Sequence, residues 1–375
     1  MAPGPQIPDH LEETAFADLP GWIRDDHAQA LRSFLRFCET PGALGGGGAF
    51  PFLAAGDLGS LCEQARETGR DKPEAAREFF ESRFTPYRIV RKGFVTGYFE
   101  PELKASRERT ADFPVPLHRK PDGLETVTDA NRPADWPDHL SHGRQQGRQT
   151  GEGLAEMPDR GAIMDGALDN EHLELVWLAD PVDAFLVHVQ GSARLRLTDG
   201  SVMRVGYAGK SGHLYTGIAR LLVQRGEGTP EDFTMSGLRS WLARHPDRRD
   251  ALFRENRSYI FFREVTEVGP EQGPVGGAGL PLTAGRSLAV DPGHIPYGTL
   301  VFVDAALDDF DSGGAFARLM VADDTGSAIR GAARGDIFVG SGTLAGEIAG
   351  EIRHAAGFTV LVPNPVDARG TAAMD

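Results

Sequence analysis

The stretch LMVADDTGSAIRGAARGDIFVG, residues 319–340, decides how this chain folds. Its first four residues, 319–322, form an apolar run long enough for a buried β-strand. Two carboxylates follow at once, Asp323 and Asp324, and then Thr325-Gly326 turns the backbone. A third carboxylate, Asp336, follows a basic, glycine-rich turn and opens a second apolar run. The stretch therefore predicts two buried strands with carboxylates at their ends.

A carboxylate at the mouth of a buried strand is costly to ionise, because apolar surroundings disfavour its charged form. Its pKa is raised as a result, which is what a general acid working near neutral pH requires. The alternative is structural, since Asp is among the commonest turn residues and caps turns by accepting from backbone amides. The stretch alone leaves both interpretations open.

A second fragment repeats the pattern. Residues 287–291, SLAVD, form an apolar run that ends in Asp291 and is followed at once by Pro292. Residues 298–303 predict a further strand. Three strand-terminal aspartates, Asp291, Asp324 and Asp336, therefore fall within one short region.

Length and composition exclude several classes of protein. The 375 residues suffice for two domains with a sizeable core, and the net charge of −15 argues against nucleic acid and against an electrostatic membrane anchor. The 47 glycines and 25 prolines suit loop-rich β-barrels better than a helix bundle. The 11 histidines are scattered without HExxH spacing, and residues 207–212, YAGKSG, lack the spacing of a phosphate-binding loop. We expect no metal and no cofactor.

Two features leave the cellular compartment open. Cys38 and Cys62 form an even pair that permits one disulfide in an oxidising compartment, but two separate core cysteines fit the sequence as well. The first residues, MAPGPQIPDHLEET, have neither a basic n-region nor an apolar h-region, so we expect neither a signal peptide nor a lipid anchor in this sequence. A mature form whose targeting segment is removed would look the same.

Helical spacing predicts three helices near the start, capped by Asp25 or Asp26, by Asp57, and opened by Pro73. Residues 87–99 predict two strands. Residues 103–172 predict only short strands and loops, with a short helix near 160–168. The hairpin signal Asp199-Gly200 then joins two alternating runs. An amphipathic helix at 342–354 and a strand at 358–362 end the predicted elements.

The run FLVHVQGS, residues 185–192, predicts a strand with Gln190 and Ser192 at its end. Gly191 between them permits a ligand to approach the backbone closely, and an amide and a hydroxyl suit sugar hydroxyls or acetamido groups. His188 fits no catalytic triad, because no nucleophile accompanies it.

The aspartate-rich region resembles the three-aspartate "3D" domain, a small double-psi β-barrel. Together with TGYFEP, residues 96–101, and VWLADPVDAFLVHVQGSARL, residues 176–195, it resembles the family of membrane-bound lytic murein transglycosylase A. The resemblance implies a mainly β fold with flanking helices. It implies a discontinuous double-psi barrel domain, 1–102 and 257–375, an inserted β-barrel domain, 103–256, and a groove between them.

The resemblance also implies a function and a site. The family cleaves the bond between N-acetylmuramic acid and N-acetylglucosamine in peptidoglycan with a single acid, giving 1,6-anhydro products. The family pattern places that acid at Asp324 and the supporting carboxylates at Asp291 and Asp336. It places the sugar contacts at Thr96, Tyr98, Gln190 and Ser192. It further implies a monomer on the periplasmic side of the outer membrane, which binds glycan strands and acts beside wall-remodelling proteins.

Asp323 and Asp324 cannot both face the scissile bond, because adjacent strand residues point to opposite sides. The charge of Asp323 is expected, if anything, to raise the pKa of Asp324.

Two alternatives remain. The first is a non-catalytic wall-binding protein built on the same barrel. The second is an aspartic protease, which needs two Asp-Thr/Ser-Gly loops, whereas Asp324-Thr325-Gly326 occurs once and Asp291 precedes Pro292-Gly293.

Overall fold

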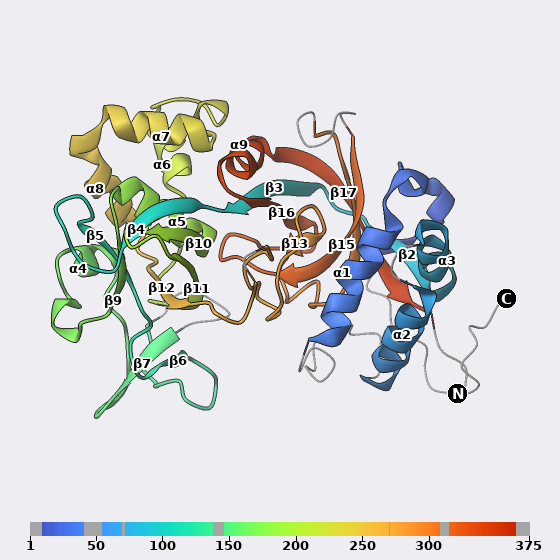
Figure 1. Ribbon diagram of the computed structural model, residues 1–375, viewed down its shortest axis with the longest axis horizontal. Coiled ribbons are helices and arrows are strands. Elements are labelled where there is room, and N and C mark those ends of the chain that lie inside the picture. Colours follow the sequence, from blue (N-terminus) through green and yellow to red (C-terminus); the bar gives the residue numbers. More distant parts are fainter. Residues whose placement is uncertain are drawn as a thin grey trace. The chain divides into compact units, whose positions relative to one another are not determined.

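The computed structural model describes residues 10–40, 55–69, 72–137, 146–269, 271–307 and 315–364, with the backbone alone at 55–57. The chain divides into two compact units (Figure 1). The first contains Met1–Phe99, Pro270–Gly340 and Glu351–Asp375, and the second contains Glu100–Gly269 and Ser341–Gly350. We predicted a first domain of 1–102 and 257–375 and an inserted domain of 103–256. The compact units differ by placing 100–102, 257–269 and 341–350 in the second unit.

The first unit is built on a sheet that closes on itself. Its strands follow the order β1-β2-β17-β14-β15-β13-β16-β3, and β17 also pairs with β3, so the strands from β17 to β3 form a closed ring. The pair β13–β15 is parallel, whereas β14 is antiparallel to both β15 and β17. The strands are β1 Leu11–Glu13, β2 Phe84–Ile89, β3 Gly93–Glu100, β13 Ser287–Ala289, β14 Leu300–Ala305, β15 Phe316–Asp324, β16 Arg334–Ser341 and β17 Arg353–Pro363.

Residues 319–324, at the end of strand β15, lie in the middle of this ring. Strand β15 lies between β14 and β13, and its residues 319–323 are all buried. Burial on both faces explains why its sequence is continuously apolar rather than alternating. The prediction of a mainly β fold with flanking helices is confirmed. The double-psi connectivity stays a prediction.

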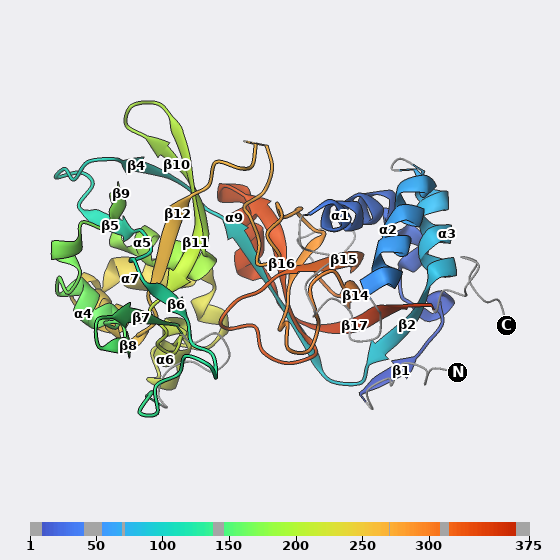
Figure 2. The same ribbon diagram turned by 90° about the horizontal axis from the view of Figure 1, so that it is seen from below.

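Three helices pack together beside the ring, as both ribbon views show (Figures 1 and 2). They are α1 His27–Glu39, α2 Ala55–Thr68 and α3 Pro73–Arg83. The Asp26 side chain accepts from the Gln29 N–H and caps α1, and Pro73 occupies the first turn of α3, so both predicted starts are confirmed. Helix α2 begins at Ala55, before Asp57, whose side chain lies outside the described residues. The helices and the ring share one core that includes Phe34, Phe80 and Phe302.

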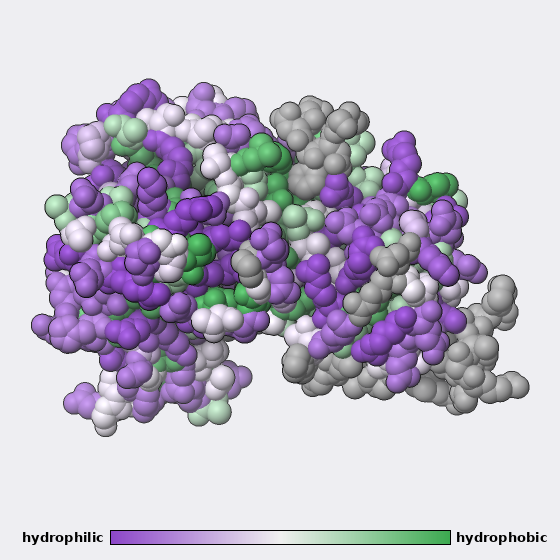
Figure 3. All heavy atoms as spheres, in the orientation of Figure 1, coloured by the Kyte–Doolittle hydropathy of each residue, from purple (hydrophilic) through white to green (hydrophobic). Residues whose placement is uncertain are grey.

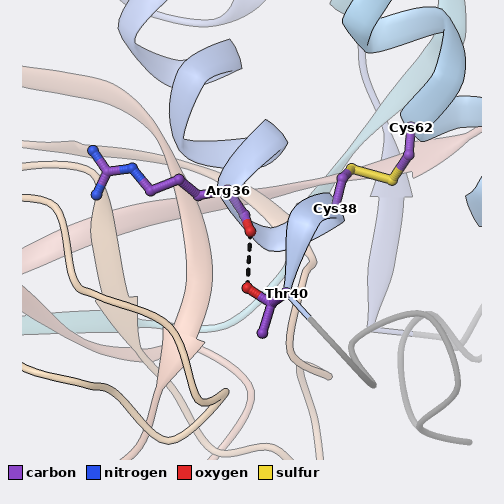
Figure 4. The surroundings of a disulfide bond; sticks show 4 residues. All are labelled: Arg36, Cys38, Thr40 and Cys62. Atoms are coloured by element: carbon purple, nitrogen blue, oxygen red, sulfur yellow. Dashed lines mark hydrogen bonds between the residues drawn. A yellow bond between two sulfur atoms is a disulfide. The ribbon is translucent and has the colours of Figure 1, made fainter. Parts of the chain in front are cut away.

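A disulfide ties two of these helices together. Cys38 of α1 bonds to Cys62 of α2, with their Cα atoms 5.7 Å apart (Figure 4). At the same end of α1, the Thr40 hydroxyl donates to the Arg36 carbonyl at 2.9 Å. The bond closes a loop with a sequence separation of 24 residues. Closing a loop of this length stabilises the fold by about 3 kcal/mol in the chain-entropy account.

The second unit contains a sheet of its own, in the order β12-β11-β10-β4-β9-β5, and a bridge between Arg119 and Phe262 links its two ends. The predicted hairpin is confirmed, since β10 pairs antiparallel with β11 around Asp199-Gly200. Its strands are β4 Glu102–Ser106, β5 Val115–His118, β9 Glu174–Leu178, β10 Ser192–Leu197, β11 Val202–Lys210 and β12 Ile260–Glu264. A small sheet contains β6 Leu124–Thr126, β7 Gln146–Thr150 and β8 Gly153–Ala155.

The helices that follow β8 are α4 Arg160–Met164, α5 Pro181–Gln190, α6 Ile218–Gln224, α7 Met235–Arg244, α8 Pro246–Glu255 and α9 Thr343–Glu351. Helix α5 packs against β5, β9 and β10 of the larger sheet, and α4, α6 and α7 each pack against α8. Single 3₁₀ turns occur at Phe16–Asp18, Trp22–Arg24, Asp169–Glu171 and Glu231–Phe233. The fully buried Glu100 holds the start of the 341–350 segment in this unit, because its carboxylate accepts from the Ser341 hydroxyl at 2.8 Å and its carbonyl from the Gly342 N–H at 2.9 Å.

One predicted element is wrong. We predicted a strand over 185–192, but residues 181–190 form helix α5, with the Asp180 side chain as N-cap and Pro181 in its first turn. Gly191 ends the helix in the left-handed conformation, at φ 80°. The helix is buried on most of its surface, so its apolar, β-branched residues cannot be told from a buried strand by periodicity.

None of the described helices is long and apolar enough to cross a membrane. The face drawn in Figure 3 is covered mostly by hydrophilic side chains, with hydrophobic side chains in small groups.

A buried ion pair fixes α1 against β15. The two terminal nitrogens of the Arg286 guanidinium donate to the Asp25 carboxylate, at 2.9 and 2.7 Å, and both side chains are 2% exposed. Arg286 also donates to the Leu319 carbonyl, and the Leu319 N–H donates to Asp25. Every strong donor in the group therefore has an acceptor, the condition under which a buried ion pair is stable.

We expect Arg286→Met to lower the free energy of unfolding by about 3–5 kcal/mol, because the Asp25 carboxylate stays buried without its cation. Urea denaturation followed by circular dichroism measures the change. Arg32→Met is the matched control, since Arg32 lies 4.0 Å from Asp26 with both side chains exposed; it is expected to cost less than about 1 kcal/mol. If both variants lose a similar, small amount of unfolding free energy, the Arg286–Asp25 pair does not stabilise the fold as we infer.

Candidate functional site

The predicted acid, Asp324, ends strand β15 and is half-buried. One carboxylate oxygen accepts from the Tyr98 hydroxyl at 2.7 Å, and the other accepts from the Gly277 N–H at 2.8 Å. Tyr98 lies on β3, and Gly277 lies in the loop that precedes β13. Two segments, each far from Asp324 in the sequence, therefore hold the two oxygens of its carboxyl group.

This environment raises the pKa of Asp324. Burial is the main cause, and the hydrogen bonds from Tyr98, Thr325 and Gly277 oppose it in part. Burial also raises the pKa of Tyr98 well above its usual range, and the nearby charge of Asp324 adds to that effect. Tyr98 therefore remains a hydroxyl donor, and Asp324 keeps its proton to a higher pH than an exposed aspartate does.

Asp323 points to the opposite side of the strand, as the alternation of strand side chains requires. It is 2% exposed and accepts from the Ser287 hydroxyl at 2.6 Å. Burial raises its pKa well above the usual range, with the Ser287 hydrogen bond opposing. Burial is the main cause of the raised pKa of Asp324, and the charge of Asp324 adds to the raised pKa of Asp323.

Asp336 occupies the start of β16 and forms the second half of the cluster. It accepts from the Thr96 hydroxyl, and that hydroxyl in turn accepts from the Arg334 guanidinium at 2.7 Å. Burial raises the pKa of Asp336 to about 6, against the opposing effects of Thr96 and of the Arg334 charge. Thr96 and Tyr98 lie two residues apart on β3, so they share one face and present their hydroxyls to two different carboxyl groups.

Asp291 lies beside this cluster, and its carboxylate binds backbone N–H groups. Its carboxylate accepts from the Gly293 N–H at 3.2 Å and the Gly331 N–H at 2.9 Å. The preceding residue, Val290, donates its N–H to the Asp324 carbonyl at 3.0 Å and accepts from the Thr325 hydroxyl at 2.9 Å. Asp291 thus holds the loop around residue 331, and its support of the acid stays a prediction.

The remaining predicted contacts lie in the second unit. Gln190 is the last residue of α5, and Ser192 is buried at the start of β10, so neither ends the strand that we predicted. The cluster around Asp324 is formed by residues of the first unit alone. Within the described residues, no group of three or more His, Cys, Asp or Glu side chains is placed to hold a metal ion.

Sequence reasoning missed Gly277 and Arg334. A Cβ at residue 277 would lie 2.4 Å from the Tyr297 hydroxyl oxygen, so only glycine brings this N–H to Asp324 without a shift of Tyr297. Glycines at positions 269, 273, 276, 277 and 279 are visible in the sequence, but the sequence does not say which backbone N–H points toward Asp324. Arg334 was visible only as part of a basic turn.

The raised pKa of Asp336 makes stability depend on pH. Between about pH 4 and pH 6 the folded chain holds a proton that the unfolded chain has released, so stability falls as the pH rises through this window. We expect the wild type to lose stability relative to Asp336→Asn between pH 3.5 and pH 8, by at most about 3 kcal/mol for a shift of about two pH units. Comparing the two proteins at both pH values cancels any constant cost of the substitution.

Chemical denaturation at the two pH values measures this difference. Glu267→Gln is the control, because its effect on stability is expected to depend on pH in the opposite direction. Arg263 lowers the pKa of Glu267 to about 2. That carboxylate contributes stability above its unfolded pKa and loses it in acid. If the difference in free energy of unfolding between the wild type and Asp336→Asn is the same at pH 3.5 and pH 8, the raised pKa of Asp336 is contradicted.

Two family models match the chain. One, described as the MltA specific insert domain, matches residues 94–263, and the other, described as the 3D domain, matches residues 286–362. The curated membrane-bound lytic murein transglycosylase A of Escherichia coli K12 is 33% identical over 278 residues, which cover 72% of this chain. The match spans 66% of that relative, just under two thirds of its length.

Solved structures of membrane-bound lytic murein transglycosylases also resemble this chain. The membrane-bound lytic murein transglycosylase of Agrobacterium tumefaciens is 42% identical, with a TM-score of 0.86 over 94% of this chain and 97% of that chain. The E. coli MltA structure with bound chitohexaose is 25% identical, with a TM-score of 0.68 over 97% of both chains. Because this chain is 42% identical to the A. tumefaciens protein and the match spans nearly the whole of both chains, the chain belongs to the family of membrane-bound lytic murein transglycosylase A and carries that family's 3D domain.

Proposed function

We propose that this protein is a peptidoglycan lytic transglycosylase whose single catalytic acid is Asp324. The observation that carries the proposal is the environment of that carboxyl group: the side chain is half-buried, its pKa is raised, and the neutral donors Tyr98 and Gly277 hold its two oxygens. Family membership supports the reaction class, and the chitohexaose bound to the E. coli relative supports a linear β-1,4-linked glycan as the substrate.

The reaction needs one group that first gives and then takes a proton. Protonated Asp324 donates to the glycosidic oxygen between N-acetylmuramic acid and N-acetylglucosamine, and the bond from that oxygen to C1 of the muramoyl residue breaks. Ionised Asp324 then accepts the proton of the muramoyl C6 hydroxyl, whose oxygen bonds to C1. The products are a free N-acetylglucosamine hydroxyl and a 1,6-anhydromuramoyl end, and Asp324 is protonated again. An acid with a raised pKa suits both transfers.

The choice between Asp324 and Asp336 rests on their partners. Arg334 lies near Asp336 and favours its ionised form, whereas the donors that hold Asp324 are neutral. We therefore assign Asp336 and Asp291 as supporting carboxylates. Asp336 remains connected to Arg334 through Thr96, and Asp291 holds the neighbouring loop.

Four residues are proposed as glycan contacts: Thr96, Tyr98, Gln190 and Ser192. Thr96 and Tyr98 have a second proposed role, because their hydroxyls position Asp336 and Asp324. We further propose that the protein acts as a monomer on the periplasmic side of the outer membrane, on glycan strands and beside wall-remodelling proteins. The family name, which describes membrane-bound enzymes, supports this location.

We expect Asp324→Asn to abolish the release of soluble fragments from purified murein sacculi, by about 10³-fold or more, because an amide cannot donate the proton that breaks the bond. Asp323→Asn is the matched control one residue away and is expected to keep cleavage, since its side chain points into the protein. Both variants are expected to sediment with sacculi. An active Asp324→Asn with an inactive, folded Asp323→Asn would reverse the assignment. A wild type that sediments but releases nothing would favour a wall-binding protein.

We expect Tyr98→Phe to move the alkaline limb of the pH–rate profile to higher pH, by about 0.5–1 unit. The Tyr98 hydrogen bond favours ionised Asp324 and lowers its pKa, so its loss raises that pKa and keeps the acid protonated to higher pH. The kcat/KM for fragment release, measured from pH 4 to pH 9, tests this. Tyr87→Phe, which removes a surface hydrogen bond to Glu13, is expected to leave the limb in place. A shift to lower pH, or none, would contradict the role of Tyr98.

A further inference from the structure

A cavity of about 400 Å³ opens in the first unit beside the carboxyl cluster. The connection between β2 and β3, the loop after Asp291 and the turn before β16 form its walls. Its side chains are strongly cationic. The basic and aromatic residues that line it include Arg91, Lys92, Phe94, His294, Arg330 and Arg334.

The charge of this cationic cavity is poorly compensated. Among the described residues, neither Arg91 nor Lys92 forms an ion pair, and both are exposed. Arg330 lies 3.9 Å from Asp291, close to the limit for an ion pair. Burial lowers the pKa of Arg334, and Asp336 opposes this only in part. In a chain with a net charge of −15, such a concentration of cations favours an anionic ligand at this place.

One face of β3 runs from the cationic cavity to the acid. Phe94 lines the cavity, Thr96 donates to Asp336, and Tyr98 donates to Asp324, and these alternate residues share a face. At the rise of a β-strand, Phe94 and Tyr98 are separated by about 13 Å. An extended peptide of about four residues spans the same distance.

The exposed aromatic side chain adds a surface for a peptide. Phe94 is 40% exposed, and the Arg334 guanidinium lies 5.5 Å from its ring centre. A wall with an apolar ring between cationic groups suits a ligand that has both carboxylates and aliphatic side chains. The concave shape, built from three separate connections, suits such a ligand better than it suits a flat membrane surface.

We propose that the cationic cavity binds carboxylates of the stem peptide attached to the muramoyl residue, so that the enzyme prefers peptide-bearing glycan to naked glycan. This inference rests on the proposed function, because the peptide reaches the cavity only when its sugar lies at Asp324. It assigns Arg91 and Lys92 to substrate selection rather than to catalysis.

The test compares kcat/KM on two substrates: peptide-bearing glycan strands, and the same strands after an amidase has removed the peptides. We expect the wild type to prefer peptide-bearing strands by about fivefold or more, the effect of two exposed charge contacts. In Arg91→Gln/Lys92→Gln the preference is expected to fall to about one, with the rate on naked strands unchanged. The control is Arg66→Gln/Lys72→Gln, which removes the same charge at exposed positions that do not line the cavity. It is expected to keep the preference.

A second arm identifies the anion. Strands whose peptide carboxylates are amidated are expected to react like naked strands with the wild type. A wild type that cleaves both substrates equally, or an Arg91→Gln/Lys92→Gln variant that keeps the full preference, would overturn the inference and leave the proposed function intact. A wild type inactive on both substrates would overturn the proposed function and, with it, this inference.

Discussion

The hydrogen bond from the Tyr98 hydroxyl to the Asp324 carboxylate is 2.7 Å long, and the arrangement of strands in the first unit is what brings these two residues together. Its two partners lie 226 residues apart, so the contact exists only if β3 takes its place in the ring with β15. Pairing of β17 with β3 closes that ring and fixes the position of Thr96, which lies two residues before Tyr98 on the same strand. The second carboxylate oxygen requires Gly277, where a side chain would clash with Tyr297. The geometry of one carboxyl group thus depends on the closure of the sheet.

Such a site lowers the stability of the fold that carries it. Burial raises the pKa of Asp323, Asp324 and Asp336, and each proton that the folded chain retains reduces stability at neutral pH. Elsewhere in the same unit, the bidentate Arg286–Asp25 pair fixes α1 to β15, and the Cys38–Cys62 disulfide joins α1 to α2. These contacts keep the strand that bears the acid rigid, as a catalytic group held to within a fraction of an ångström requires.

Local signals in the sequence predicted much of this structure. The apolar run before Asp324, the cap at Asp26, Pro73 at a helix start and the Asp199-Gly200 hairpin each act within a few residues, so their patterns are visible. Helix α5 was misassigned because a buried helix and a buried strand share the same apolar composition. The pairing of Arg286 with Asp25 spans 261 residues, and that of Thr96 with Asp336 spans 240. No local pattern encodes such contacts, which explains why the partners of the acid had to come from the structure.

In the proposed reaction one carboxyl group, Asp324, performs both proton transfers, so no water enters the broken bond. Cleavage of purified murein in H₂¹⁸O, followed by mass spectrometry of the new ends, tests this most directly. We expect every new muramoyl end to be a 1,6-anhydro ring without ¹⁸O. Reducing ends that carry ¹⁸O would contradict it, because they would mean hydrolysis assisted by a second carboxylate.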